Sequence, residues 1–525
     1  MLIHVGTPAR PGLLRHAAAL ACFAAALLAL ARILRAGHPV QAYLVNSDAL
    51  YLPVLFDDLL ARGGSLADWY LTPAPYFFPD FPLYFLAWLD GGDALRQVTL
   101  FALLQVAATG TALFLLARQA LPTGRLPAAA ALSVLFVWLG LHAGGPYVYL
   151  FSSAHHYGAF LAALLLLALW LGRDGMRDGQ PGRRSAMAVL LLVFLATLSD
   201  ALFLVQTVLP LTIVALLCRH GAPCTTAPRR VLLLLLAPAL AAMLSYRFLV
   251  AHPTRYKARL GFSAFQAHLD ELAGIAGALF GAHPLLAAAL LPALLAGLVC
   301  CIACCIALLR GRAVAGLPRP LMLLLAFSAL SCGASLALML LSTNVDAVPR
   351  YLITALSMPL VSGLFALSWL LGRHFGPVCL GLATVFTVLL ALQAWQVRDT
   401  RATAQYFYPE QLACIDRALA AADARHGIAQ YWDAKRLQAL SRRRLTLAQY
   451  VDTLEPMEWI TSRRYFTGQY DFAIVAHDGD PRFRLPQARL LAMAGKPAQS
   501  VSCGDRTVLL FAPPGLRLAP AAASR

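Results

Sequence analysis

The acidic residues with the clearest chemical potential lie in one polar stretch near the start of the chain. Asp48 follows Ser47, and the pair Asp57 and Asp58 stands a short distance beyond it. A carboxylate beside apolar segments is partly desolvated and can act as a general base. Ser47 or Asp48 equally fits the N-cap of a helix that begins at Ala49, and from the residues alone capping is the better interpretation.

Basic residues that could hold an anion form two groups. Arg350 opens an apolar run, and Arg255, Lys257 and Arg259 cluster in another polar segment. A guanidinium can bind a phosphate through paired hydrogen bonds. For Arg350 we favour this role over simple snorkelling at a membrane boundary, whereas the other cluster fits a phosphate and anionic lipid headgroups equally well.

A third set of polar residues could contact the hydroxyl groups of a sugar. His155 and His156 are adjacent, so on a helix their side chains would diverge by about 100° and make a poor metal chelate. Packing at the membrane interface is the alternative for both. Asp200 interrupts a long apolar stretch, and an acid in such a place usually faces the protein interior.

The cysteines differ in their surroundings. Four lie in one apolar run without a His or an acid to complete a metal site, namely Cys300, Cys301, Cys304 and Cys305. We interpret them as small apolar residues and predict no metal site, leaving open whether a divalent metal is needed. Cys414 and Cys503 follow the last apolar run. Because the outer compartment of bacteria is oxidising, we predict a disulfide between them, with two free thiols as the alternative.

The elements that must position these residues follow from the composition. Of 525 residues, 60% are hydrophobic and 13% are charged, against about 25% charged in soluble domains. One soluble core cannot bury so much apolar surface, but a lipid bilayer can. The net charge of +17 is spread over short loops between apolar runs. This pattern indicates membrane topology and no nucleic-acid partner.

The apolar runs predict a mainly α, polytopic bundle of about eleven membrane spans. They cover residues 13–34, 94–117, 127–143, 155–172, 186–199, 201–218, 231–250, 284–309, 320–342, 351–371 and 376–396. Basic loops alternate along the chain, so the N-terminus is expected in the cytoplasm, with the first span retained rather than cleaved. The runs on either side of Asp200 are short for full crossings. Acidic residues gather on the opposite, outer face, where we expect the chemistry.

The chain is predicted to divide after residue 396. Residues 1–396 form the membrane module, with a long first outer loop at 37–93, and residues 397–525 form a small soluble α/β domain in the periplasm. In that domain we predict a helix at 411–424 and strands at 472–476 and 507–511. Its segment Gln430–Lys435 and Trp459 have aromatic faces that suit a sugar, although an ordinary core is slightly favoured.

Two short motifs carry a family resemblance. Phe81-Pro82-Leu83-Tyr84 and Val348-Pro349-Arg350-Tyr351-Leu352 resemble the GT-C superfamily of polyprenyl-phosphate-sugar-dependent glycosyltransferases, in the branch of protein O-mannosyltransferases and the lipid A aminoarabinose transferase. The resemblance implies that Asp48 is the catalytic base, with Asp57 or Asp58 as the fallback, and that Arg350 binds the lipid phosphate. The chain departs from the family in the single proline at Pro82 and in lacking a second acid directly beside Asp48.

The resemblance implies an inverting membrane glycosyltransferase of the bacterial inner membrane. It would move a sugar from a polyprenyl-phosphate donor to a periplasmic acceptor, which is a glycolipid, a polysaccharide or a protein. Arg255, Lys257 and Arg259 would assist at the phosphate, and His155, His156, Asp200, Asp80 and Tyr84 would contact substrates. No cofactor is predicted. The alternative is a non-enzymatic transporter or flippase for an anionic lipid or polysaccharide, which charges buried in the middle of the spans would favour.

Overall fold

Each of the eleven apolar runs forms a helix. The computed structural model describes residues 11–172, 183–217, 228–253, 259–281, 284–312, 314, 316–344, 346–397 and 406–518. The eleven helices are α1 (Pro11–Arg35), α5 (Ala94–Ala120), α6 (Arg125–His142), α7 (Tyr157–Leu171), α9 (Arg183–Ser199), α10 (Leu209–Leu217), α12 (Ala237–Leu249), α14 (Pro284–Leu309), α15 (Arg319–Leu341), α16 (Ile353–Leu371) and α17 (Phe375–Gln396). Except for the starts of α10 and α12, which shorter helical segments precede, their ends lie within a few residues of the bounds that the sequence predicts, because hydropathy alone marks them.

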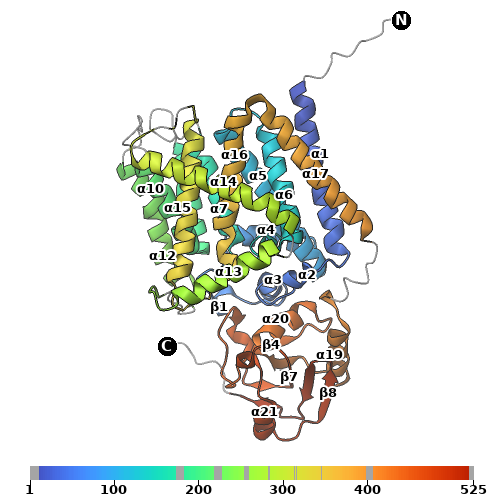
Figure 1. Ribbon diagram of the computed structural model, residues 1–525. Helices are drawn as coiled ribbons and strands as arrows, with labels where there is room; N and C mark the ends of the chain where they lie inside the picture. Colours follow the sequence, from blue (N-terminus) through green and yellow to red (C-terminus); the bar gives the residue numbers. More distant parts are fainter. Residues whose placement is uncertain are drawn as a thin grey trace, which may run out of the picture.

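The helices make a multi-pass membrane bundle. Within the described part of the chain, six helices are long and apolar enough to cross a membrane, and three shorter apolar helices accompany them. In the bundle α17 packs against α1 and α6, and α15 packs against α14 and α16 (Figure 1). Large apolar side chains such as Leu28 and Phe248 point outward, and Phe248 is 87% exposed. A lipid-facing surface requires such an arrangement.

Short extra segments lengthen three of these helices. Helix α10 is preceded by a π-helical turn, η4 (Leu204–Val208), and α12 by α11 (Pro228–Val231) and η5 (Leu232–Leu236). A 3₁₀ turn, η6 (Pro349–Leu352), leads into α16. Ser199-Asp200 separates α9 from the next helical segment, where the sequence predicts a break. Helix α13 (Phe265–Gly281) lies in a segment for which no helix is predicted.

The first outer loop folds into short elements at one end of the bundle. It contains α2 (Gln41–Leu44), α3 (Tyr51–Ala61), β1 (Trp69–Leu71) and α4 (Asp80–Trp88). Helix α3 buries Tyr51, Leu52 and Leu55. Residues 45–50 join α2 to α3, so Asp48 lies at the edge of the bundle rather than inside a span.

Residues 406–518 form an α/β region below that end of the bundle (Figure 1). Its five-stranded sheet has the order β4 (Thr446–Gln449), β3 (His426–Ala429), β7 (Phe472–Ala476), β9 (Arg506–Leu510) and β8 (Gln499–Cys503). Strand β3 runs parallel to β4 and β7, whereas β9 is antiparallel to β7 and β8. Its helices are α19 (Glu410–Ala421), α20 (Tyr431–Leu440) and α21 (Gln487–Ala494). The helix and the two strands predicted here correspond to α19, β7 and β9.

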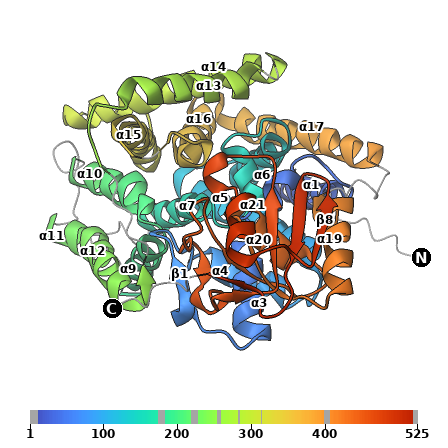
Figure 2. The same ribbon diagram turned by 90° about the horizontal axis from the view of Figure 1, so that it is seen from below.

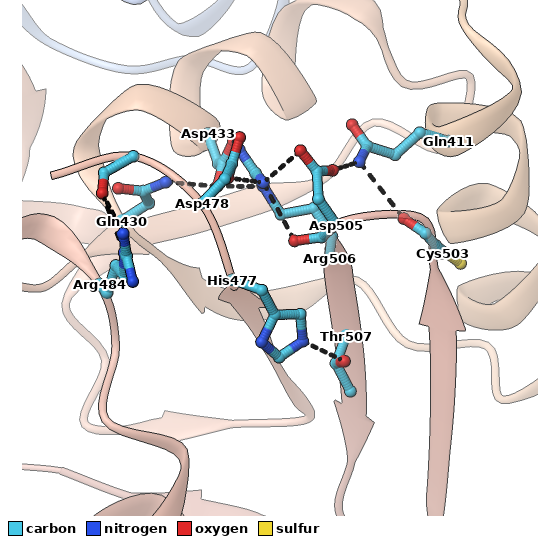
Figure 3. A network of polar contacts seen from close by, with 11 residues as sticks. Gln411, Gln430, Asp433, His477, Asp478, Arg484, Cys503, Asp505, Arg506 and Thr507 are labelled. Atoms are coloured by element: carbon cyan, nitrogen blue, oxygen red, sulfur yellow. Dashed lines mark hydrogen bonds and ion pairs between the residues drawn. The ribbon is translucent and has the colours of Figure 1, made fainter. Parts of the chain in front are cut away.

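Two features fix the helices of this region to its sheet. Cys414 of α19 and Cys503 at the end of β8 form a disulfide, with their Cα atoms 5.6 Å apart. Arg506 of β9 is surrounded by three carboxylates (Figure 3). Its Nε and Nη2 donate to Asp433 of α20 at 2.8 and 3.1 Å, and its Nη1 pairs with both Asp478 and Asp505. This network holds the first turn of α20 in one orientation.

The C-terminal region is docked onto the outer loops by backbone pairing and ion pairs. Strand β1 pairs antiparallel with β5 (Thr461–Ser462) and parallel with β2 (His252–Pro253). Arg463 Nε lies 2.8 Å from Asp68 Oδ1, and Arg62 Nη1 donates to the Leu445 carbonyl at 3.1 Å. Seen from below, the region lies across α3 and α4 and leaves α10 and α12 uncovered (Figure 2). Two more short strands, β6 (Gln469–Tyr470) and β10 (Leu516–Arg517), pair with each other.

Candidate functional site

Asp48 is free to do chemistry because another residue provides the local cap. The side-chain Oδ1 of Asn46 accepts the Ala49 N–H at 2.8 Å, and α3 begins only at Tyr51, after Leu50 without a side-chain cap. The interpretation of Ser47 or Asp48 as the N-cap is therefore wrong. Asn, Asp and Ser are nearly equivalent caps, so the three consecutive candidates could not be ranked from sequence.

Arg350 meets Asp48 across the outer end of the bundle. Its Nη1 donates to Asp48 Oδ2 at 3.0 Å. The side chains of Arg350 and Asp48 are 30% and 15% exposed, so both retain access to solvent. Arg350 Nε is buried, and no described residue accepts a hydrogen bond from it. The guanidinium also lies 5.5 Å from the centre of the Tyr351 ring.

Helix α20 of the C-terminal region brings two further residues to Asp48. The hydroxyl of Tyr431 donates a short hydrogen bond to Asp48 Oδ1. Lys435, one turn later, is fully buried; its Nζ lies 4.1 Å from the centre of the Tyr431 ring and donates to Gln449 Oε1 at 3.2 Å. Ser47 Oγ donates to the Tyr431 carbonyl at 2.7 Å. The segment Gln430–Lys435 is therefore more than ordinary core, because two of its side chains lie at Asp48.

His155 and His156 precede α7 and point to different partners. His155 Nδ1 lies 2.6 Å from the Ser153 carbonyl and 2.7 Å from Ser152 Oγ, and its ring stacks on Tyr149 at 4.8 Å. Because Nδ1 has a carbonyl partner, we assign the ring proton to it, which leaves Nε2 as an acceptor. Burial lowers the pKa of His155 to about 4, so the ring is neutral at pH 7.

His156 belongs to a second polar group beside the first. Its Nδ1 lies 2.7 Å from Asp200 Oδ2, and its Nε2 lies 3.4 Å from the Tyr76 hydroxyl. The ring centre is 5.1 Å from that of Tyr351, which places this group next to Arg350. Asp200 also accepts the Leu202 N–H at 3.0 Å. The same carboxylate therefore stabilises the turn that follows α9 and orients His156.

The surroundings of Asp48 favour its ionised form. Burial by itself would raise the pKa of the Asp48 carboxyl. The neighbouring His155, Arg350 and Lys435 side chains and the hydrogen bond from the Tyr431 hydroxyl together outweigh burial, so the pKa of Asp48 lies below its usual value. Since His155 is neutral at pH 7, Arg350 carries the permanent positive charge. Burial lowers the pKa of Lys435 to about 7, although the Asp48 charge acts in the opposite direction.

Asp80 lies under the histidine turn. Its Oδ1 accepts the Ala154 N–H at 3.0 Å, while its Oδ2 is buried without a partner among the described residues. Burial raises the pKa of Asp80 to about 7; the Ala154 N–H opposes this shift and the nearby Asp200 carboxylate adds to it. Ala154 and His156 both have positive φ, at 60° and 66°. The contact from Asp80 therefore supports a turn that is unfavourable for non-glycine residues.

Other candidates from the sequence lie elsewhere. Asp57 pairs with Arg62 at 2.5 Å, and Asp58 Oδ2 accepts the Trp69 indole N–H at 2.8 Å. The Tyr84 hydroxyl donates to Gln97 Oε1 at 2.6 Å. Arg259 is described only through backbone contacts, its N–H to Asn344 and its carbonyl to Thr343. Arg255 and Lys257 lie outside the described residues. Thus the structure groups Asp48, Arg350, His155, His156 and Asp200, and it gives Asp57, Asp58, Tyr84 and Arg259 other contacts.

The residues that sequence reasoning did not assign to the site are Tyr431, Lys435, Tyr76 and Tyr351. One signal for Lys435 was present, because Lys is rare in a chain whose basic residues are nearly all Arg. Lys435 also stands one helical turn after an aromatic residue, where the side chains of a helix meet. In the described ranges no group of three or more His, Cys, Asp or Glu could hold a metal ion.

Comparisons with known proteins identify the fold. The structure matches ArnT from Cupriavidus metallidurans bound to undecaprenyl phosphate with a TM-score of 0.51 and 13% sequence identity, over 96% of this chain and 99% of that one. The apo state of that ArnT matches with a TM-score of 0.50 and 12% identity, over 93% and 97% of the two chains. No family model and no curated protein matches the sequence. The chain therefore has an ArnT-like fold, as the resemblance of its motifs predicts.

Proposed function

We propose that the chain is a membrane glycosyltransferase that uses a polyprenyl-phosphate sugar as donor. The observation that carries this proposal is the contact between Asp48 and Arg350 at the outer end of the bundle. It places a carboxylate that can accept a proton beside a guanidinium that can bind a phosphate. The fold supports it, because the similar ArnT was solved with undecaprenyl phosphate bound.

In the proposed reaction Asp48 accepts the proton of an acceptor hydroxyl as that oxygen attacks the anomeric carbon. The new carbon–oxygen bond forms while the bond between the anomeric carbon and the phosphate oxygen breaks, and the electron pair leaves with the lipid phosphate. Arg350 stabilises the charge that develops on this phosphate, which is the main electrostatic task of the step. Attack from the face opposite the phosphate inverts the anomeric centre.

The neighbouring polar groups complete this proposal. His155 lies close enough to Asp48 to influence its charge and keeps an acceptor nitrogen, Nε2, and the His156–Asp200 pair contacts Tyr351 next to Arg350. We assign these three residues to contacts with sugar hydroxyls. Asp80 would act through the turn that carries the histidines, and Tyr84 through the packing of α4 on α5. Arg255, Lys257 and Arg259 remain proposed as auxiliary contacts to phosphate or lipid.

The proposal includes a topology. Residues 1–396 would form the membrane module with eleven crossings and residues 397–525 a periplasmic domain, with the N-terminus in the cytoplasm of a bacterium. The acceptor would then be a periplasmic glycolipid, polysaccharide or protein. The described charges at Asp48, Arg350 and Asp200 lie near helix ends and loops. A transport site would instead be expected near the bilayer midplane.

Transfer from a labelled donor tests the function. Synthetic undecaprenyl-phosphate sugars, each labelled in the sugar, are supplied to the purified chain in nanodiscs together with bacterial envelope lipid and polysaccharide. We expect label in an acceptor, and a loss of about 100- to 10,000-fold for Asp48→Asn. The matched control is Asp90→Asn, because Asp90 also pairs with an arginine, Arg96, but on the exposed side of the loop. Full activity of Asp48→Asn would exclude this mechanism, and label movement across the membrane without transfer would favour the transporter.

A further inference from the structure

The carboxylate of Asp48 accepts hydrogen bonds from two side chains that come from different parts of the chain. Arg350 of the membrane bundle binds Oδ2, and Tyr431 of the C-terminal region binds Oδ1. The proposed function gives Arg350 a second task, because the same guanidinium has to bind the donor phosphate. The proposed function gives Tyr431 no task, although its hydroxyl is buried and directed at the catalytic base.

Binding of the donor weakens the hydrogen bond from Arg350 to Asp48 and leaves the one from Tyr431 in place. The phosphodiester of the donor, like the Asp48 carboxylate, carries one negative charge shared by two free oxygens, so it competes with Asp48 for the Arg350 nitrogens. The lipid phosphate that departs carries more negative charge and competes more strongly. When Arg350 turns to the phosphate, Asp48 loses one of its two side-chain partners. A base that can rotate away from the acceptor hydroxyl loses much of its efficiency. A second, independent anchor is then needed on Oδ1.

The attachment of the C-terminal region makes α20 a rigid anchor. Ser47, next to Asp48 in the chain, donates to the Tyr431 carbonyl at 2.7 Å. The β1–β5 pairing and the Asp68–Arg463 ion pair fasten the region to the first outer loop. On the opposite side of α20, Asp433 is held by Arg506 of the sheet (Figure 3). Tyr431 is therefore fixed from the loop, from its own helix and from the sheet.

Lys435 is arranged to strengthen the Tyr431 hydroxyl as a donor. Its Nζ lies over the face of the Tyr431 ring and has one described hydrogen-bond acceptor, Gln449. A cation on the face of a phenol ring withdraws electron density from it, which makes the hydroxyl a better donor. Burying an ammonium group is costly, so this position is difficult to explain by packing alone.

We propose that Tyr431 and Lys435 are positioning residues of the active site, through which the C-terminal region holds Asp48 in place when the donor phosphate engages Arg350. Tyr431 acts directly on the Asp48 carboxylate, and Lys435 acts through the Tyr431 ring. The inference rests on the proposed glycosyltransferase function. It also gives the C-terminal region a part in the reaction besides any binding of an acceptor.

The decisive variant is Tyr431→Phe, which removes the hydroxyl and keeps the ring above Lys435. We expect kcat for sugar transfer to fall about 10- to 100-fold, with KM for the labelled undecaprenyl-phosphate sugar and binding of undecaprenyl phosphate within about twofold. The matched control is Tyr450→Phe, because Tyr450 is another buried tyrosine of this region and its hydroxyl lies 2.9 Å from that of Tyr470. It is expected to keep its kcat.

A pH profile separates positioning from mere folding. The titratable and charged groups around Asp48 are Arg350, His155, Tyr431, Lys435, Tyr76 and Tyr149. Loss of the Tyr431 hydrogen bond destabilises the Asp48 carboxylate, so the acid limb of kcat should move to higher pH by about one unit. His155 is present in both proteins and cannot cause the difference. A purely structural role for Tyr431 would lower the amount of active protein without moving the limb.

Lys435→Met tests the second residue. Its kcat should fall by a smaller factor than that of Tyr431→Phe, and adding it to Tyr431→Phe should cost less than twofold more, because Lys435 acts through the hydroxyl that is already absent. Full kcat and an unshifted acid limb in Tyr431→Phe would overturn the inference, as would a parallel loss of undecaprenyl phosphate binding. If Asp48→Asn also keeps full transfer, the proposed function fails as well; if only Asp48→Asn loses transfer, the function stands and this inference fails.

Discussion

Nη1 of Arg350 lies 3.0 Å from Oδ2 of Asp48, although the two residues are 302 positions apart in the chain. Asp48 and Arg350 bind each other in this structure, whereas in the proposed reaction Asp48 contacts the acceptor hydroxyl and Arg350 contacts the donor phosphate. The carboxylate stands where Arg350 would hold a phosphate, and the guanidinium keeps Asp48 ionised. In the proposed reaction this pair is the state before the donor binds, and exchange of the carboxylate for the donor phosphate at Arg350 releases the base.

The first prediction concerns this exchange. In Asp48→Asn the carboxylate no longer competes for Arg350 and no longer repels a phosphate, so undecaprenyl phosphate should bind about two- to tenfold more tightly. Titration of the lipid into nanodisc-embedded protein at low salt measures this. Arg350→Ala should abolish the gain in the double variant. Weaker binding by Asp48→Asn would mean that the carboxylate supports the phosphate site instead of competing with it.

The second prediction concerns the stability cost of Lys435. Burial lowers the pKa of Lys435 to about 7 in the folded chain, against 10.5 for an unburied lysine. Between these values the unfolded chain binds more protons, so the free energy of unfolding rises with pH over this window. Lys435→Met removes the dependence. At pH 7 this variant should be more stable than the wild type, by at most about 5 kcal/mol.

The melting midpoint of the detergent-solubilised protein, measured from pH 7 to pH 10, checks the second prediction. The advantage of Lys435→Met should shrink as the pH rises, because the wild-type lysine loses its charge in both states. Lys496→Met provides the control, since Lys496 lies on an exposed surface of the same region. A lower midpoint for Lys435→Met at every pH would show that packing around the ammonium, and not its charge, decides the stability.

The membrane-spanning helices were predictable because the hydropathy of the sequence marks each of them. A helix in lipid has to present apolar side chains along its length, and α14 and α16 accordingly match the predicted runs 284–309 and 351–371 almost residue for residue. Helix α13 was missed because an amphipathic helix beside the membrane has mixed hydropathy. Hydropathy does not determine the number of membrane crossings in the same way, because α10 is shorter than a full crossing requires.

The candidate site was predictable only in part. Asp48 and Arg350 stand in local patterns, an acid after the first span and a Pro-Arg-Tyr motif before a late one, and patterns of this kind can be recognised. The contact between Asp48 and Tyr431 joins residues 383 positions apart. Neither periodicity nor spacing records such a contact, because it depends on how β1 and β5 pair.

The third prediction concerns the disulfide between Cys414 and Cys503. The bond closes a loop of 89 residues and ties α19 to the edge of the sheet. On chain entropy alone this closure stabilises the region by about 4 to 5 kcal/mol. Cys414→Ser should therefore lower the unfolding midpoint of the C-terminal region, and a reducing agent should lower that of the wild type but not that of the variant. Cys300→Ser, at an exposed free cysteine, is the control. Insensitivity of the wild type to reduction would contradict the prediction.

The fourth prediction concerns Asp80 and the turn above it. Burial raises the pKa of Asp80 to about 7 in the folded chain, against 3.8 for an exposed aspartate. The folded chain then holds more protons between pH 4 and 7, so the free energy of unfolding falls as the pH rises through this window. Asp80→Asn keeps an acceptor for the Ala154 N–H and avoids a buried charge. Its melting midpoint should exceed that of the wild type at pH 8 and not at pH 4.

Gly158 tests the same contact from the other side. A Cβ at Gly158 would lie 2.4 Å from Asp80 Oδ2 and 2.8 Å from Pro79 Cδ, so Gly158→Ala has to push α7 away from α4. Because His155 and His156 directly precede α7, transfer should fall more than tenfold, since small displacements of positioning groups cost about 100-fold. Gly381→Ala is the control, because a Cβ at Gly381 would meet no atom within 4 Å, and it should leave transfer unchanged. If Gly158→Ala kept full transfer while Gly381→Ala did too, the spacing between Asp80 and the histidine turn would have no part in placing the site.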